Sequence, residues 1–286
     1  MSEVFVFFLH GLAYAGLLFL VSSGLTIVFG MMNVLNFAHA AFYMLGAYTA
    51  YSIMQYSGSF VLALVISPLV LLVLGSVVEK FLLRKVHSGG HVYELLLTFG
   101  LAYLIQEAVK FIWGTAPRAI TVSGVLTDTV TLFGFTYPVY RLFVFGAAVC
   151  VGLAMALILY KTRVGIIVRA AVDDSQMVGA LGINVPFFFM AVYGVGAALS
   201  AFAGVVAGPL LSVFPGMAES ILIDAFVVIV VGGMGSLGGA VLASLVIGEL
   251  QSFGVLWFPE FSLALIYLLM ALVLVIKPEG LLGEKQ

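Results

Sequence analysis

The residues best suited to work outside an apolar environment lie in one polar stretch, 161–186, which holds five charged side chains. The sequence predicts a single short helix within 169–183, because Asp173, Asp174 and Ser175 are preferred N-cap types and Gly182 is a preferred terminator. Pro186 then prevents the helix from continuing. Two interpretations are open: a loop lying in the lipid headgroup layer, or a docking helix for a cytoplasmic partner. Its length favours docking, because most connections have about 4–6 residues.

The predicted helix carries a small apolar face with charged residues around it. Met177, Val178 and Leu181 are spaced as neighbours on one face of a helix, so we expect them to supply apolar contacts. The charged residues near the start of the helix would set its register against a partner. The candidate docking residues are Arg169, Asp173, Asp174, Met177, Val178, Leu181 and Gly182.

Residue patterns for covalent or metal chemistry are absent from the sequence. It contains no HExxH, no GxSxG and no Cys/His cluster with metal-ligand spacing. It also lacks GxxxxGK[ST], the loop that cradles nucleotide phosphates, so it has no ATP site of that kind. No basic cluster suits nucleic acid, and the single Cys150 forms no internal disulfide. The chain is therefore expected not to be an enzyme and to need no cofactor of its own.

The composition places most of the 286 residues in lipid. The chain is 64% hydrophobic and 8% charged, with a mean hydropathy of +1.26, whereas a soluble domain is about 25% charged. Long continuous apolar runs predict an all-α polytopic membrane protein, because helices satisfy their own backbone hydrogen bonds in lipid. Alternating runs typical of a β-barrel are not seen.

The apolar runs give the expected elements of a single transmembrane domain, 1–286. They lie at about 4–30, 38–56, 60–83, 92–113, 138–160, 187–210, 222–235, 238–257 and 261–276. A crossing needs roughly 20 residues, so 222–235 is expected to be a broken or re-entrant segment beside about eight transmembrane helices. The loop 115–137 contains Thr, Val and aromatic residues on both sides of Gly134, which predicts a small hairpin.

The Lys and Arg residues predict the orientation. If 161–186 is cytoplasmic and the runs alternate, eight of these residues lie inside and three outside, which fits the positive-inside rule. The N-terminus is then outside and the C-terminus inside, which requires an odd number of crossings or one re-entrant hairpin. The inside group is Lys80, Arg84, Lys85, Lys161, Arg163, Arg169, Lys277 and Lys285, and the outside group is Lys110, Arg118 and Arg141.

Two breaks in the apolar runs, Gly30–Asn36 and Gly232–Gly239, are candidates for a translocation pathway. Irregular backbone at membrane depth is tolerated where it lines a cavity, and paired breaks in two halves of a transporter often mark a site. The alternatives remain open: glycines that allow close helix packing, and Asn and His side chains that form a structural polar network. The candidate pathway residues are Asn33, Asn36, His39, Gly232, Gly233, Gly235 and Ser236.

Acidic residues near the ends of the runs are expected to pair with neighbouring lysines. Glu79 is adjacent to Lys80, and Glu107 lies three residues before Lys110. Two further carboxylates inside the apolar runs, Asp224 and Glu249, are expected to face a seam with a second subunit, since an unpaired charge in lipid costs roughly 2.5–3.5 kcal/mol.

Four segments together resemble permease subunits of branched-chain amino-acid ABC importers, the LivH type. They are the run from Thr162 to Ile183, the NFAH and YMLGAY pieces within 36–48, GGMGSLGG at 232–239, and KPEGLLG at 277–283. The resemblance covers essentially the whole chain, with one departure at Ala40, where the family usually has glycine. This departure leaves the backbone path after His39 open.

The resemblance implies the ABC importer permease fold and a set of partners. It implies a second permease subunit that is a paralogue, two cytoplasmic ATPase subunits that bind ATP, a periplasmic substrate-binding protein, and a bacterial inner membrane with the N-terminus periplasmic and the C-terminus cytoplasmic. The segment 161–186 would be the loop that couples ATPase closure to transport. The solute would be a branched-chain amino acid or a similar small polar molecule, such as urea or a short amide. An ion-coupled secondary transporter and a passive channel are the alternatives.

Overall fold

The computed structural model describes residues 2–132 and 134–283, and almost all of them lie in helices. Nine helices of 15 or more residues occur in the described part of the chain. They are α1 (Ser2–Met32), α2 (Ala38–Ser57), α3 (Phe60–Val78), α5 (His91–Trp113), α6 (Val139–Lys161), α9 (Val185–Leu211), α10 (Met217–Gly232), α11 (Leu237–Trp257) and α12 (Ser262–Ile276).

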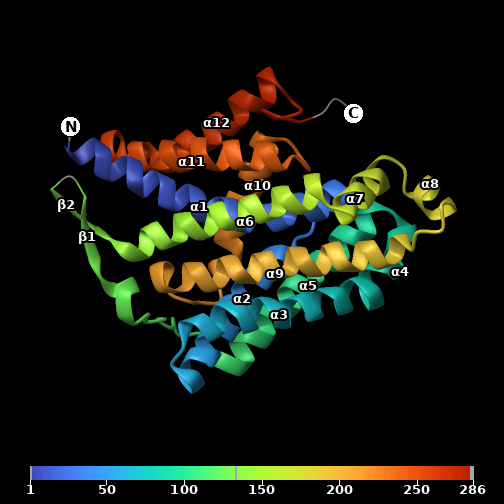
Figure 1. The fold of residues 1–286 in the computed structure, drawn as a ribbon, viewed down its shortest axis with the longest axis horizontal. Coiled ribbons are helices and arrows are strands. Elements are labelled where there is room, and N and C mark those ends of the chain that lie inside the picture. The colour runs from blue at the N-terminus through green and yellow to red at the C-terminus, as the bar shows by residue number, and fades with distance from the viewer. Residues whose placement is uncertain (1, 133, 284–286) are drawn as a thin grey trace.

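The long helices lie roughly along one direction, and the two ends of the bundle differ (Figure 1). The N-terminus and the hairpin lie at one end. The C-terminus lies at the other end, with two short helices of the 161–186 loop, α7 (Arg163–Asp173) and α8 (Ser175–Ala180). The termini are therefore on opposite sides of the bundle, as an odd number of crossings requires.

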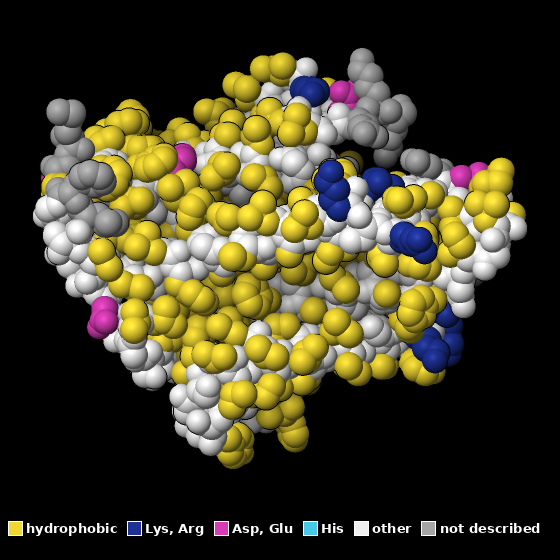
Figure 2. Space-filling model, viewed as in Figure 1, with side chains coloured by type: hydrophobic (Ala, Val, Ile, Leu, Met, Phe, Trp, Pro, Cys, Tyr) yellow, Lys and Arg dark blue, Asp and Glu magenta, His cyan; other side chains and the backbone are white. Residues whose placement is uncertain are grey.

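Hydrophobic side chains cover the middle of the molecule, as lipid requires. In Figure 2 the Lys and Arg side chains visible on this face lie toward the end that carries α7, α8 and the C-terminus. Seven of the described helices are long and apolar enough to cross a membrane; α2 and α10 are not among them. The first two-thirds of α2 are nevertheless buried inside the bundle, so protein rather than lipid surrounds its polar residues.

The core forms where α1, α2 and α9 meet. α9 packs against α1, α2 and α3, and α1 also packs against α6 and α11. Small residues make these contacts close: a Cβ added to Gly46 of α2 would lie 2.4 Å from the Cα of Ala201 in α9. Such pairs let helix backbones touch, which is how helices associate in lipid.

The predicted apolar runs correspond to the observed helices, with two differences of extent. α3 continues through a π-helical turn (Glu79–Leu83) and a short helix, α4 (Arg84–Val86), before a 3-10 turn (His87–Gly89) leads into α5. The run predicted as broken, 222–235, is α10, a continuous helix of 16 residues that begins earlier and ends at Gly232. It is shorter than a full crossing, so the expected shortness is confirmed and its position is corrected.

The outer connection contains the predicted hairpin. A 3-10 turn (Gly124–Thr127) precedes strand β1 (Thr129–Leu132), which pairs antiparallel with β2 (Phe135–Pro138). The segment before the hairpin is tied to the loop after α9, because the backbone groups of Arg118 and Val213 exchange two hydrogen bonds of 2.7 Å. Another 3-10 turn (Pro259–Phe261) joins α11 to α12 at this same end of the bundle.

The prediction of one helix within 169–183 is wrong, because the structure has two there. α7 covers Arg163–Asp173 and α8 covers Ser175–Ala180, with a break at Asp174. Thr162 caps the first helix by accepting a hydrogen bond from the Gly165 N–H at 3.3 Å. The N-cap signal at Asp174 was therefore correct, but a second helix that ends at the same place was not foreseen.

Candidate functional site

α8 forms a small projection with exposed apolar side chains at the end of the bundle that carries the C-terminus. Asp174 fixes its start, since its Oδ1 accepts hydrogen bonds from the N–H groups of Gln176 (3.0 Å) and Met177 (2.8 Å). Met177 and Leu181 are 60% and 73% exposed, whereas Val178 is 4% exposed. The expectation that these three share one exposed face is therefore corrected: Val178 anchors α8 to the bundle, and Met177 and Leu181 point outward.

The polar docking candidates are engaged within the chain. The Arg169 guanidinium donates to the carbonyl oxygen of Leu159 and lies 5.5 Å from the centre of the Tyr160 ring. Asp174 is the cap of α8, and the side chain of Asp173 lies outside what the structure describes. Gly182 has a φ of +83°, a conformation that suits glycine and turns the chain toward α9. The exposed apolar side chains of Met177 and Leu181 are thus free of the intrachain contacts that hold Arg169 and Asp174.

Two of the candidate pathway side chains connect helices. The Asn36 side-chain oxygen accepts a hydrogen bond of 3.1 Å from the Tyr193 hydroxyl of α9. His39 is buried, its Nε2 lies 2.9 Å from the carbonyl oxygen of Val21 in α1, and its own carbonyl accepts from the Ser200 hydroxyl at 2.6 Å. These contacts support the structural-network interpretation for both residues.

Asn33 is exposed and ends α1 with a φ of +52°. Asparagine tolerates this left-handed conformation better than most residues.

The glycines of 232–239 pack backbone against backbone at the end of the bundle that holds the C-terminus. A Cβ on Gly232 would lie 2.5 Å from the carbonyl carbon of Gly239, and one on Gly235 would lie 3.0 Å from the Cα of Gly30. The C-terminal segment closes this contact, since the N–H groups of Leu281 and Leu282 donate to the carbonyls of Val231 (2.8 Å) and Gly232 (2.9 Å). Gly233 packs against Gly283, and Ser236 caps α11.

A groove of about 260 Å³ lies beside α10. Asn36 and Phe37 of the α1–α2 connection line it, with Ile223 and Phe226 of α10 and Tyr267 of α12. A second hollow of about 130 Å³ continues past Phe37 toward Gln106 and Glu219, which are joined by a hydrogen bond of 3.2 Å. Of the candidate pathway residues, Asn36 is the one that lines the groove.

Comparison with protein families decides the class of this chain. Residues 7–274 match the family described as "Branched-chain amino acid transport system / permease component". The chain belongs to this permease family.

Curated relatives of the permease cover nearly its whole length. It is 28% identical to the high-affinity branched-chain amino acid transport system permease protein BraD of Pseudomonas aeruginosa, over 97% of this chain and 95% of the relative. It is 26% identical to LivH of Escherichia coli K12, over 100% and 99%. A probable LivH of Methanocaldococcus jannaschii is 26% identical over 84% and 77%. No solved structure matches the chain.

The family fixes the role of the chain within its transport system. It is a multi-pass membrane permease component of an ABC system, and ATP is bound and hydrolysed by a partner ATPase rather than by the permease. A binding protein and a partner permease belong to such a system. No cofactor belongs to the permease family.

Three of the four acidic residues discussed above have a side-chain partner among the described residues of the permease, and Glu249 has no hydrogen-bond partner there. Glu107 pairs with Lys110 at 2.7 Å, as predicted. Glu79 does not pair with Lys80: its carboxylate is buried and binds Arg84. Asp224 accepts from the Tyr14 hydroxyl at 3.2 Å, and the Glu249 carboxylate lies against Gly11, so both are turned toward α1 of their own chain.

Sequence reasoning missed the residues that line the groove and the role of Arg84. Phe37, Ile223 and Phe226 look like any other apolar residue of a membrane helix, and nothing in their spacing separates a groove from a lipid-facing surface. From the sequence, Arg84 is predicted only to be one of the positive charges on the inner side of the membrane. Its spacing of five from Glu79 does not fit an ordinary helical pair, so the sequence offered no signal for their contact.

Proposed function

We propose that this permease moves a branched-chain amino acid, or a similar small polar solute, across the membrane when partner ATPases push on α7 and α8. The supporting observation is α8 itself, a capped helix that exposes Met177 and Leu181 outside the apolar part of the bundle. An ATPase surface that covers these side chains would remove apolar area from water. The substrate class is proposed from the transport systems to which the relatives belong, which move branched-chain amino acids.

The proposed orientation puts α7, α8 and the C-terminus in the cytoplasm and the hairpin in the periplasm. It is supported by the exposed Lys80, Lys85 and Lys161, which lie at the α7 end of the bundle. Lys285 lies outside the described residues. We place the binding protein against the outer loops 115–137 and 211–221, and two ATPases beneath a pair of permeases. The resemblance to the family favours a paralogue as the second permease.

The substrate path is proposed to follow the groove beside α10, with the second permease closing its open side. α10 is shorter than a full crossing, and Gln106 and Glu219 place polar groups along the hollow that continues the groove. A polar solute needs such groups where lipid offers none. In this arrangement the glycine contacts of 232–239 hold the inner ends of α1, α10 and α11 in place beside the path.

Reconstitution tests the function directly. Purified permease in liposomes, with its paralogue, the ATPase and the binding protein, is expected to accumulate radiolabelled leucine, isoleucine or valine only when ATP is present. Urea and a short amide serve as alternative solutes. Uptake by the permease alone, driven by an ion gradient, would make it a secondary transporter. Uptake that merely equilibrates the solute without ATP would make it a channel.

Filling the groove tests the path. The substitution Ile223→Trp is expected to lower ATP-driven uptake roughly tenfold, about 1.4 kcal/mol in barrier height, because the larger side chain occupies space that the solute needs. Initial rates of solute uptake in the reconstituted system measure it. Leu153→Trp is the matched control, since Leu153 is exposed on α6 away from the groove. Equal rates for the two variants would place the path elsewhere.

A further inference from the structure

An ion pair between the buried Glu79 and the exposed Arg84 lies where α3 gives way to its π-helical turn. Glu79 is 1% exposed, and Arg84 donates to both of its carboxylate oxygens, from Nε at 3.2 Å and from Nη2 at 2.8 Å. The π turn makes the pair possible: the Arg84 N–H donates to the Glu79 carbonyl, five residues back, which brings the two side chains together. π turns are rare in proteins overall, and those that occur are often found at functional sites.

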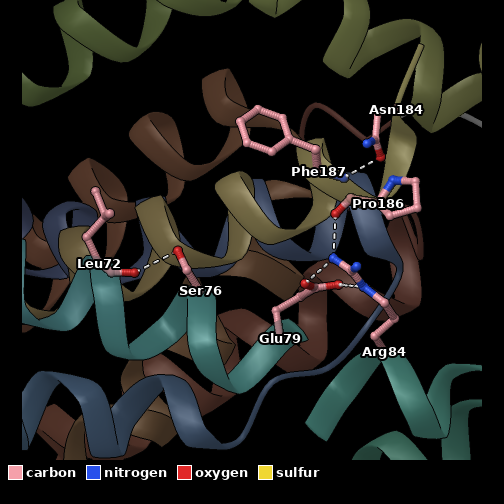
Figure 3. Close-up of polar contacts among 7 residues, drawn as sticks. All are labelled: Leu72, Ser76, Glu79, Arg84, Asn184, Pro186 and Phe187. Carbon is pink, nitrogen blue, oxygen red and sulfur yellow. Dashed lines mark hydrogen bonds and ion pairs between the residues drawn. The ribbon is translucent and has the colours of Figure 1, made fainter. Parts of the chain in front are cut away.

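The same guanidinium reaches a second helix. Arg84 Nη2 also donates to the carbonyl oxygen of Pro186 at 2.7 Å, across 102 positions of sequence (Figure 3). Pro186 lies in the first turn of α9, which begins directly after the α7–α8 loop. Asn184 caps this turn by accepting from the Phe187 N–H at 3.2 Å. Arg84 therefore joins the end of α3 to the point where the loop enters the membrane bundle.

Beyond this joint, α3 and α9 are packed without free space. A Cβ on Gly194 of α9 would lie 2.3 Å from the Ser76 hydroxyl oxygen and 2.9 Å from the Leu72 carbonyl oxygen. One on Gly75 would lie 2.6 Å from the Ala197 Cβ. Close-packed helices transmit displacement rather than absorb it. A shift at the first turn of α9 would thus move both helices together, provided that the joint at Arg84 holds.

We propose that Arg84 is a positioning residue for coupling: it passes movement of the α7–α8 loop to α3 as well as to α9. This rests on the proposed function, in which an ATPase moves that loop. A planar guanidinium suits the task, because it binds a carboxylate with two donors and still presents a donor to the Pro186 carbonyl. The charge of Glu79 keeps the guanidinium at this place, and the π turn sets its direction.

The substitution Arg84→Lys tests the proposal. Lysine keeps a positive charge beside Glu79 but lacks the planar fork, so we expect solute uptake per ATP hydrolysed to fall about fivefold or more. The double variant Glu79→Gln/Arg84→Gln removes both charges at once, leaves no uncompensated buried charge, and is expected to give the same loss. ATP hydrolysis and solute uptake are measured in the same reconstituted complex, and the midpoint of thermal unfolding is measured in detergent. Lys85→Gln, which removes the exposed neighbouring charge, is the control expected to leave the ratio unchanged.

The outcomes separate the roles. A lower ratio with an unchanged unfolding midpoint supports positioning. Either variant coupling as well as the wild type overturns it, and so does loss of folded protein in both variants, because the pair would then serve only to hold the fold. The wild-type complex distinguishes failure of the Arg84 proposal from failure of the proposed function. If its uptake does not require the ATPase, the proposed function itself fails, whatever the Arg84 variants do.

Discussion

The substitutions Met177→Asp and Leu181→Asp are each expected to lower ATP-driven uptake strongly while the permease still inserts and folds. Both side chains are largely exposed at the surface of α8, so the free permease loses little from either change. In the complex, the new carboxylate would be buried against an apolar ATPase surface, where an unpaired charge is strongly disfavoured. We expect uptake to fall roughly tenfold or more, equivalent to at least about 1.4 kcal/mol of lost interaction.

The measurement is uptake in the reconstituted system, together with pull-down of the ATPase by the detergent-solubilised permease. Tyr56→Asp is the matched control, since Tyr56 is 94% exposed in the last turn of α2 and lies outside α8 and the loops assigned to the binding protein. Normal uptake by both α8 variants would mean that α8 is not the coupling surface. Val178→Asp is expected to behave differently, because Val178 is buried and its replacement should lower the amount of folded permease.

The long helices were predictable because a continuous apolar stretch in lipid must form a helix. The length of the stretch therefore gives the length of the helix. The run 139–161 is an example: a helix is the solution that pairs every backbone group of one segment. The family motifs added what composition cannot supply, namely the class of transporter. The hairpin followed from Gly134, whose φ of +87° is the turn conformation that glycine adopts easily.

The two helices of the 161–186 loop were harder to predict, because Asp174 both ends one helix and begins the next. Asp174 is an N-cap, but the carbonyl of Ala170 accepts its backbone N–H, so it also ends α7. Pro186 was taken as a stop for the preceding helix, yet it lies in the first turn of α9, where proline is well tolerated. A capping signal locates a boundary without saying whether a helix lies on one side or on both.

The polar contacts could not be predicted, because they join residues far apart in the sequence. Asn36 meets Tyr193, and Arg84 meets Pro186, only after α9 has packed against α2 and α3. The glycines of 232–239 showed the same limit. Their sequence was consistent with a pathway or with close packing, and the position of Gly235 against Gly30 became apparent only in three dimensions.

The substitution Gly204→Ala is expected to destabilise the permease, because Gly204 is buried where α9 meets α2. α2 and α9 touch at Gly204: a Cβ there would lie 2.0 Å from the Tyr43 carbonyl oxygen and 3.1 Å from the Ala47 backbone nitrogen. These are backbone atoms, so no rotamer change makes room, and the two helices must move apart. Overpacking of this kind costs about 1–3 kcal/mol.

The control is Gly146→Ala, which is expected not to lower the stability of the permease. Gly146 lies in α6 and has no heavy atom within 4 Å of an added Cβ. There alanine should stabilise the helix by up to about 1 kcal/mol, because glycine is the poorer helix former. Thermal unfolding of the two variants in the same detergent gives the comparison: a lowered midpoint for Gly204→Ala and an unchanged or raised midpoint for Gly146→Ala. Equal midpoints would mean that α2 and α9 are separated by more space than their backbones occupy here. The close contact would then not be what fixes α9, and with it Tyr193 and the first turn at Pro186, relative to α2.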